Sequence, residues 1–269
     1  RGNSGGTTFG PPFPRLPPRR PDPAAPLEPA LSLARAMNGH VSVLIDTPVA
    51  RYIAMDPMGG SYVASDALKQ AMADDDANAA EIEERLRRED VPFDIIRSEA
   101  EPVEALSRAA RLADVAVLSR SGGLAGELAL VSHTPVLALG DDAPLAMPLG
   151  KVCVAWDGGD EAAIALRGAV PLLAGCESVE LLTVAGKPGG FSTPHALGYL
   201  SPRGVKAELQ ELQRRGSTEE TLAVAVGQAG ADLLVMGAFG HSRVRQFLFG
   251  GVTRYFLEEA QSPPLLLAH

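Results

Sequence analysis

Cysteines, aromatic side chains and basic residues are all scarce in this sequence. With only Cys153 and Cys176 present, neither a disulfide framework nor a four-cysteine zinc site is expected, so a reducing compartment, the cytoplasm, is the default expectation. The 24 lysines and arginines against 33 aspartates and glutamates leave a formal net charge of −9, which argues against a dedicated nucleic-acid-binding protein. No run of about 18 uncharged apolar residues occurs, so a membrane span is not expected either.

Proline, glycine and charge are unevenly distributed along the chain. Nine of the 22 prolines and four of the 28 glycines fall in residues 1–29, and residues 1–20 hold four arginines and no acid, so the rest of the chain carries −13. Residues 1–26 have too little apolar surface to offset the entropy lost on ordering. We therefore expect a disordered Pro/Arg-rich segment there.

From residue 27 onward, segments with helical periodicity alternate with short apolar runs. A glycine, Gly39, is expected to end the first helix, Ser65 or Asp66 to cap the second, and Pro171 to break or kink a later one. The expected helices are 27–39, 65–90, 101–113, 161–175, 217–230 and 250–261. The expected strands are 40–46, 91–99, 114–120, 134–140, 151–159, 178–186, 205–212, 231–237 and 263–269.

This alternation predicts an α/β fold with a mostly parallel sheet covered on both faces. The element order occurs twice, so a tandem duplication explains it better than one large sheet. We expect two doubly wound parallel-sheet domains, residues 27–140 and 150–269, separated by a segment rich in proline and small residues. The first domain is incomplete: the stretch PRLPPRRPDP precedes its first helix where a central strand would be needed.

Three glycines follow the buried strand at 231–237: Gly237, Gly240 and Gly250. Ligands of a doubly wound sheet bind beyond the carboxyl ends of its strands, where glycine lets backbone amides approach a phosphate. Gly250, Gly251, Val252 and Thr253 stand at an expected helix start, where free N–H groups favour an anion. The pattern predicts phosphate binding, with a ligand-free structural turn as the alternative.

Charged and polar side chains lie within the same connection. Arg243 and Arg245 are either phosphate partners or part of a solvated face, and His241 and Ser242 are adjacent without forming a catalytic pair. Asp157, at the end of the strand 151–159, either contacts a ligand or caps the next helix.

The G-x-x-G-x9-G spacing of Gly237, Gly240 and Gly250 resembles the universal stress protein family. The resemblance extends to VCVAWDGG and to the element order of 150–269, and covers the first half by element order alone. It implies an adenine nucleotide α-hydrolase-like fold, dimers or fused copies, and, in one subclass, binding of ATP or AMP.

In that subclass the resemblance assigns roles by position. Gly237, Gly240, Gly250 and Val252 would hold phosphates, Asp157 would lie near ribose, phosphate and a Mg²⁺ ion, and Val184 would contact adenine. The nucleotide-binding pattern expects Ser or Thr after the third glycine, whereas this sequence has Gly251. That change removes a hydroxyl donor, worth about 1.5–3 kcal/mol toward a charged group, unless Thr253 compensates.

The resulting hypothesis is a stress-response regulatory protein that binds ATP or AMP, with Mg²⁺, through its C-terminal domain. Its first half would act as an intramolecular pseudo-dimer partner, and the chain would also form homodimers. No catalytic residue is assigned. The alternatives are a weak ATP hydrolase using Asp157 and His241, and a nucleotide-free scaffold.

Overall fold

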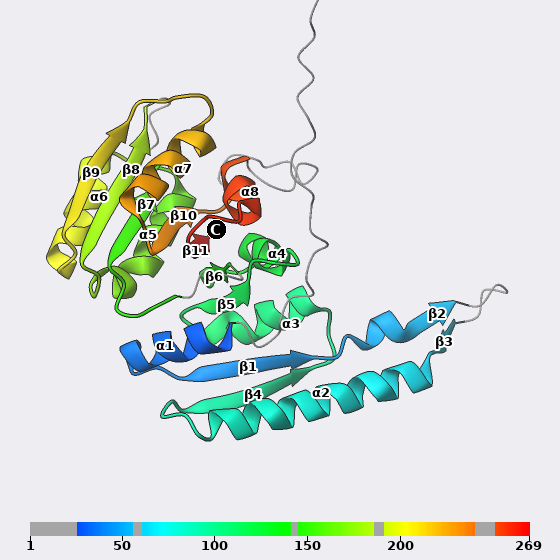
Figure 1. Cartoon of the computed structure of the whole chain (residues 1–269). Helices are drawn as coiled ribbons and strands as arrows, with labels where there is room; N and C mark the ends of the chain where they lie inside the picture. Colours follow the sequence, from blue (N-terminus) through cyan, green and yellow to red (C-terminus); the bar gives the residue numbers. More distant parts are fainter. Residues whose placement is uncertain (1–25, 56–60, 141–144, 186–190, 240–250) are drawn as a thin grey trace, which may run out of the picture.

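A computed structural model describes residues 26–55, 61–140, 145–185, 191–239 and 251–269 (Figure 1). Over these residues, helices and strands alternate as the sequence predicts. The helices are α1 (Leu27–Met37), α2 (Ser65–Leu86), α3 (Pro102–Ala109), α4 (Leu124–Val131), α5 (Asp160–Leu173), α6 (Thr193–Leu200), α7 (Thr218–Ala229) and α8 (Gly251–Glu258), with 3-10 turns η1 (Val49–Tyr52), η2 (Ala110–Leu112) and η3 (Ser201–Arg203). The strands are β1 (Val41–Asp46), β2 (Ile53–Met55), β3 (Ser61–Val63), β4 (Phe93–Ser98), β5 (Ala116–Ser119), β6 (Val136–Leu139), β7 (Lys151–Ala155), β8 (Ser178–Val184), β9 (Ala207–Leu212), β10 (Leu233–Gly237) and β11 (Leu265–Ala268).

A seven-stranded sheet crosses both halves of the chain in the order β5-β6-β11-β10-β7-β8-β9. Within each half the neighbouring strands are parallel, and β6 and β11 join the halves by antiparallel pairing, with Leu137 opposite Leu266. The second half alone supplies β9-β8-β7-β10-β11, with its first strand in the centre. The tandem order expected from the sequence is therefore present, but the two halves share one continuous sheet.

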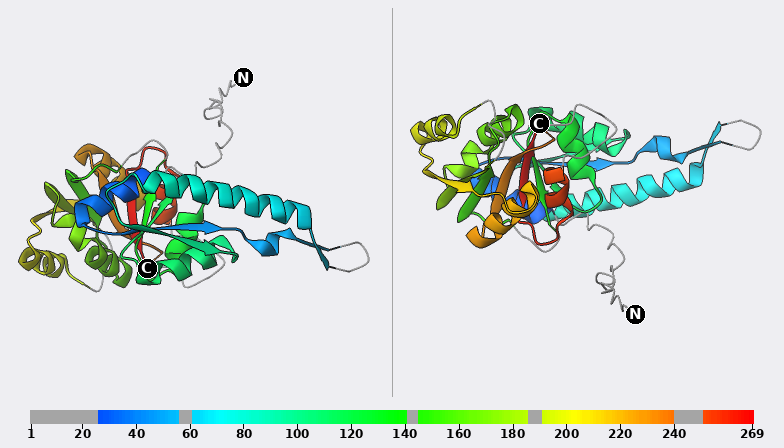
Figure 2. Two further views of the ribbon diagram at one scale, coloured as in Figure 1. Left: turned by 90° about the horizontal axis from the view of Figure 1, so that it is seen from below. Right: turned by 90° about the horizontal axis from the view of Figure 1, so that it is seen from above.

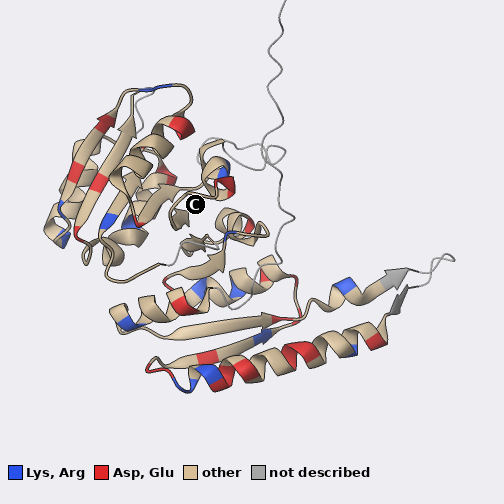
Figure 3. Ribbon diagram, viewed as in Figure 1, with Lys and Arg blue, Asp and Glu red and all other residues tan. Residues whose placement is uncertain are grey.

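The remaining strands of the first half form a separate parallel pair, β1 and β4. The antiparallel hairpin of β2 and β3 and the long helix α2 extend from this pair away from the seven-stranded sheet, as both views of Figure 2 show. Acidic side chains follow one another along α2 (Figure 3). Within the described residues, no strand precedes β1. The disordered segment expected at residues 1–26 lies, except for Pro26, outside the described part of the chain.

Two apolar clusters cover the two faces of the large sheet. One packs under α5 and α6 and includes Val154, Trp156 and Leu166, and the other packs under α4, α7 and α8 and includes Cys153, Met236 and Phe256. A third, smaller cluster of Leu27, Leu31, Ala34, Val41, Leu86 and Val91 joins α1, α2 and β1. Alternate side chains of each central strand thus enter opposite cores, as the pleat requires.

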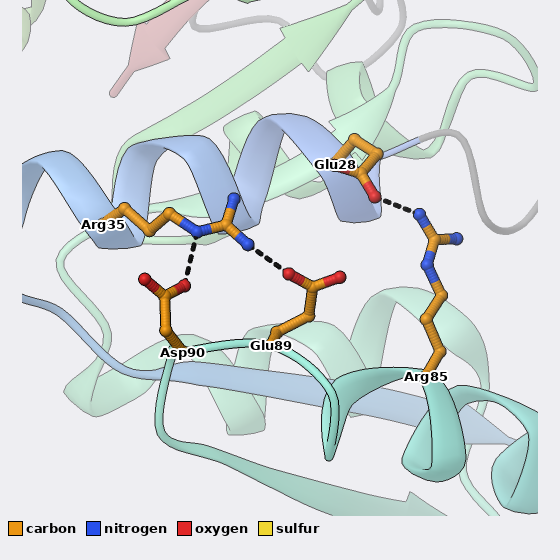
Figure 4. Close-up of polar contacts among 5 residues, drawn as sticks. All are labelled: Glu28, Arg35, Arg85, Glu89 and Asp90. Atoms are coloured by element: carbon orange, nitrogen blue, oxygen red, sulfur yellow. Dashed lines mark hydrogen bonds and ion pairs between the residues drawn. The ribbon is translucent and has the colours of Figure 1, made fainter.

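Ion pairs connect α1 to the end of α2 (Figure 4). Arg35 pairs with Glu89 and, through its Nε at 2.6 Å, with Asp90, and Arg85 pairs with Glu28. These side chains are exposed to solvent, which screens the charges, so each pair adds little to stability. Their contribution is to orient α1 on α2 rather than to stabilise the fold.

The expected local signals are partly correct. Ser217 and Glu220 form the predicted capping box at α7. Two other expectations are wrong: Asn38 takes the left-handed position after α1 in place of Gly39, and Ala64 is the N-cap of α2. Pro171 does not break α5, which continues to Leu173. Pro171 lies in the last turn of α5, two residues before the helix ends.

Helix α6 was not expected, because its surroundings are rich in proline and glycine. Its start carries Pro194 in the first turn, where the missing N–H costs nothing, and Ala196 and Leu200 bury one face. None of the described helices is long and apolar enough to cross a membrane.

Candidate functional site

The strand ends that the sequence singled out meet at one edge of the large sheet. β7, β8 and β10 are parallel, so their carboxyl ends point to the same edge, and Ala155 is opposite both Met236 and Leu182. Asp157, Val184 and Gly237 therefore lie at or just beyond neighbouring strand ends. This is the edge at which doubly wound sheets bind ligands.

Gly237 is fixed by packing. A Cβ at this position would lie 2.5 Å from the backbone nitrogen of Ala162 and 2.7 Å from the carbonyl carbon of Glu161, in the first turn of α5. Such distances do not occur between real atoms, so any side chain here would push α5 away from β10. Gly237 is thus required for close contact between strand and helix, whatever else it does.

Phe239 and Thr253 connect the two ends of the segment 240–250. The Phe239 N–H donates to the Thr253 hydroxyl at 3.4 Å, and both residues are buried. Phe239 adopts φ 66°, a left-handed conformation that a bulky side chain rarely takes. The hydroxyl that the sequence offered as a phosphate donor therefore accepts a hydrogen bond from the backbone at the beginning of the connection.

Helix α8 begins at Gly251, directly after this connection. Gly251 is exposed and Val252 is half-buried against the cluster under α4, α7 and α8. A Cβ on Gly251 would meet nothing closer than an oxygen of Glu219, 3.8 Å away on α7. The missing hydroxyl at this position is therefore not a consequence of lack of space.

Asp157 closes the turn after β7. Its Oδ1 accepts the N–H of Gly159 at 2.8 Å, and Gly158 takes φ 78°. The N-cap of α5 is Gly159, without a side-chain cap, so Asp157 does not cap this helix as one alternative had it. The exposed carboxylate lies just beyond the end of β7, held by the turn that it closes.

Val184 is the last residue of β8 and is half-buried on the same side of the sheet as Val252. Both pack against the cluster under α4, α7 and α8. The side chain offered for adenine contact is thus on the face of the sheet that carries α8. The other predicted site residues lie outside the described part of the chain: Gly240, His241, Ser242, Arg243, Arg245 and Gly250.

The same place in the first half is built differently. Only residues 120–123 separate β5 from α4, whereas residues 238–250 separate β10 from α8. Gly123 precedes α4 at φ 84°. The short connection leaves no counterpart of the long glycine-containing segment in the first half.

Sequence reasoning missed Phe239 and Glu219 at this edge, and Arg120 at the opposite edge of the sheet, where β11 begins. Phe239 carries the unusual φ, and Glu219 is the nearest side chain to the open space at Gly251. Arg120 donates to the carbonyls at the end of α8. No local pattern identifies them, since each acts through a contact with a distant part of the chain.

Among the titratable side chains of the described residues, no reactive or metal-binding group stands out. Burial, with a smaller effect of the Glu180 charge, raises the pKa of the Cys153 thiol to about 12, so the thiol is inert at neutral pH. The described part of the chain contains no group of three or more His, Cys, Asp or Glu side chains that could hold a metal ion. In the described residues, this edge of the sheet offers backbone amides and one carboxylate, that of Asp157, held by its turn.

Comparisons with known proteins bear on this arrangement. The sequence model of the universal stress protein family matches residues 148–268. No curated protein sequence matches the chain significantly.

Solved structures similar to the chain include a universal stress protein from Archaeoglobus fulgidus DSM 4304, at TM-score 0.67 and 14% identity over 92% of each chain. A functionally unknown protein from Pseudomonas aeruginosa PAO1 aligns at TM-score 0.55 and 14% identity over 90% of this chain and 86% of its own. A universal stress protein solved in complex with cAMP aligns at TM-score 0.37 and 18% identity over 45% of this chain and 98% of its own.

The first two structures share the fold along almost the whole chain, including the incomplete first half. The family match in turn covers the half that holds the complete five-strand unit and the glycine-containing connection. Residues 148–268 therefore belong to the universal stress protein family, and the chain as a whole shares the α/β fold of the two solved structures that align along its length.

Proposed function

We propose that this protein binds an adenine nucleotide, ATP or AMP, at the carboxyl edge of β7, β8 and β10, and that it acts as a regulatory protein whose nucleotide-bound state is recognised by a partner. In this proposal residues 150–269 are the nucleotide-binding domain and residues 27–140 are a degenerate domain that takes the place of a dimer partner. The antiparallel pairing of β6 with β11 supports that second role.

The observation that carries the proposal is the connection between β10 and α8. Its two ends are held together by the Phe239 to Thr253 hydrogen bond, and α8 starts immediately after it. A helix start directs unpaired N–H groups and a partial positive charge toward an anion. The glycines at 237, 240 and 250 stand in the spacing of the nucleotide-binding members of the family.

The nucleotide would be placed by groups from three strand ends. Phosphates would lie at the N–H groups of Gly251, Val252 and the preceding glycines, with Asp157 near the ribose and Val184 against the base. Arg243 would add positive charge, with His241 and Ser242 beside it. Since the chain is acidic overall, affinity would depend on these local groups and not on the protein's net field.

The residues described fit a magnesium ion that arrives with the nucleotide. Mg²⁺ is held by phosphate oxygens, waters and one or two carboxylates in many nucleotide sites. Asp157 supplies one exposed carboxylate at this edge, and no further acidic cluster exists among the described side chains to hold a metal by itself. Magnesium would neutralise phosphate charge here.

Calorimetric titration with ATP and with AMP, each with and without Mg²⁺, tests the proposal. Binding in the micromolar to millimolar range is expected. The Gly251→Ser variant should bind ATP about 10-fold more tightly or better, because it restores a hydroxyl donor worth about 1.5–3 kcal/mol toward a charged group.

The Gly251→Ala variant is the matched control. It fills the same open space, whose nearest neighbour is 3.8 Å away, but adds no donor, so its affinity should stay near that of the wild type. If neither wild type nor Gly251→Ser binds at millimolar ligand, the protein is a nucleotide-free scaffold and the proposal is wrong.

A further inference from the structure

Arg120 is the first residue after β5, in the first half of the chain, yet its side chain ends in the second half. Nη1 donates to the carbonyl oxygens of Phe256 at 3.1 Å and Ser262 at 3.3 Å, and Nη2 donates to that of Ala260 at 3.4 Å. These residues are the last turn of α8 and the chain that follows it. One guanidinium thus holds three carbonyls across the junction between the halves.

The position of Arg120 in the repeat explains why its side chain can reach the end of α8. Its N–H donates to Leu139 at 2.7 Å, just as the N–H of Ala238 donates to Ala268 at 2.7 Å, so Arg120 is the positional counterpart of Ala238. Since β6 pairs with β11, the end of β5 faces the return segment from α8 to β11. Where the second half continues into its glycine-containing connection, the first half presents this arginine.

The contact is suited to the end of a helix. The last carbonyls of a helix lack intrahelical partners and carry partial negative charge. A planar guanidinium can satisfy several of them at once, which a lysine cannot do in the same way. Arg120 is half-buried, so solvent screens the interaction less than at the open surface.

Both ends of α8 are therefore tied to other parts of the molecule. Thr253 ties its first turn to Phe239, and Arg120 ties its last turn to the first half. The helix has only eight residues, about 12 Å, too short to be stable by itself, so tertiary contacts, these two and the packing of Phe256, fix its position. The backbone amides at its start can receive a phosphate without reorganisation only while α8 stays in place.

We propose that Arg120 is a positioning residue for the nucleotide phosphates: from the degenerate half of the chain it fixes α8, and thereby sets the affinity of the opposite end of that helix for phosphate. This inference rests on the proposed function. It gives the first half a regulatory role in the site, because any partner that displaces Arg120 would weaken nucleotide binding, and by linkage nucleotide would disfavour that displacement.

The test compares ATP with adenosine in wild type and three variants. Arg120→Ala should weaken ATP binding about 5-fold or more while leaving adenosine affinity within about 2-fold, because only phosphate uses the start of α8. Arg120→Lys keeps the positive charge but loses the planar guanidinium with its several donors, so its ATP affinity should lie between those of the wild type and Arg120→Ala. Arg108→Ala, which removes an exposed arginine paired with Glu104 in the same half, is the control and should change neither affinity.

Hydrogen exchange along α8 in the ligand-free protein is the second measurement. Arg120→Ala should speed exchange of the α8 amides, and Arg108→Ala should not. Equal ATP affinity in wild type and Arg120→Ala, equal weakening of ATP and adenosine, or unchanged α8 exchange would each overturn the inference alone. Absence of ATP binding to the wild type would overturn the proposed function and this inference with it.

Discussion

The two halves of the chain differ most at the centre of their sheets. In the second half β7 lies between β8 and β10, and residues of β10 such as Leu233, Leu234 and Val235 are 0% exposed. In the first half no described strand joins β1 to β5, and Leu118, 9% exposed, is the one buried residue of β5. A central strand buries both its neighbours, so its loss divides one sheet into two weaker pieces.

The halves also differ in the connection after the fourth strand of the repeat. The second half carries the glycine-containing segment and a helix start suited to an anion, whereas the first half has a short turn and Arg120. The first half thus contacts the end of α8 through Arg120.

The largest predicted effect tests whether the two halves unfold together. Leu137→Ala removes a fully buried side chain opposite Leu266 at the junction, and should cost about 3–5 kcal/mol. Trp156, the single tryptophan, lies in the second half, so its fluorescence reports unfolding there. Because β6 and β11 share one sheet, the fluorescence midpoint in denaturant should fall with this substitution in the first half.

Leu86→Ala is the matched control. Leu86 is equally buried, but in the separate cluster of α1, α2 and β1. Its loss should lower the midpoint measured by circular dichroism more than the one measured by Trp156 fluorescence. An equal shift of the fluorescence midpoint by both variants would show that the β1–β4 unit and the large sheet are one cooperative unit.

A smaller effect is predicted for the glycines of the second half. Gly237→Ala should cost about 1–3 kcal/mol, because its Cβ would overlap the first turn of α5. Gly251→Ala should stay within about 0.5 kcal/mol, since its Cβ enters open space. Thermal unfolding of the two variants decides this, and a neutral Gly237→Ala would refute the packing role given to that residue.

The smallest effects concern pH, and they should have opposite signs in the two halves. Burial, and next the charge of Asp75, raises the pKa of Asp46 above 3.8, whereas hydrogen bonds with the backbone and side chain of Ser217 lower the pKa of Glu220 below 4.5. Ionisation of Asp46 therefore destabilises the fold fully at a pH above the pKa of Asp46 in the folded state. At a pH below its pKa in the unfolded state, Asp46 has no such effect. Ionised Glu220 stabilises the fold above its unfolded pKa, and this is lost as the pH falls through its folded pKa.

Melting curves between pH 3 and pH 7 separate these contributions. Asp46→Asn should raise the melting temperature at pH 7, by about 1–3 °C, and have less effect near pH 3. Glu220→Gln should lower it at pH 7 and have less effect near pH 3. A loss of stability at pH 7 in Asp46→Asn would contradict the buried-charge explanation.

Much of the fold could be predicted because local patterns carry it. The apolar runs of β7, β10 and β11 and the capping box of Ser217 and Glu220 are visible along the sequence and occur where expected. Helices α4 and α6 and the hairpin of β2 and β3 were missed, since each lies among prolines, glycines or polar residues, and α6 buries only Ala196 and Leu200. The glycine spacing predicts a site at the carboxyl edge of β7, β8 and β10, and this stays a prediction. For Gly237 the structure gives a separate reason, its close packing against α5.

What the sequence determined by itself is the repeated α/β order, the acidic body and the glycine spacing after β10, because these depend on residue type and distance along the chain. What only the tertiary structure decided is the contact made by each residue: Gly237 against α5, Thr253 with Phe239, and Arg120 on the end of α8. The tertiary structure alone also decided that the two halves join through the pairing of β6 with β11. Such contacts join positions far apart in the sequence, and no local propensity encodes which distant backbone a side chain will meet.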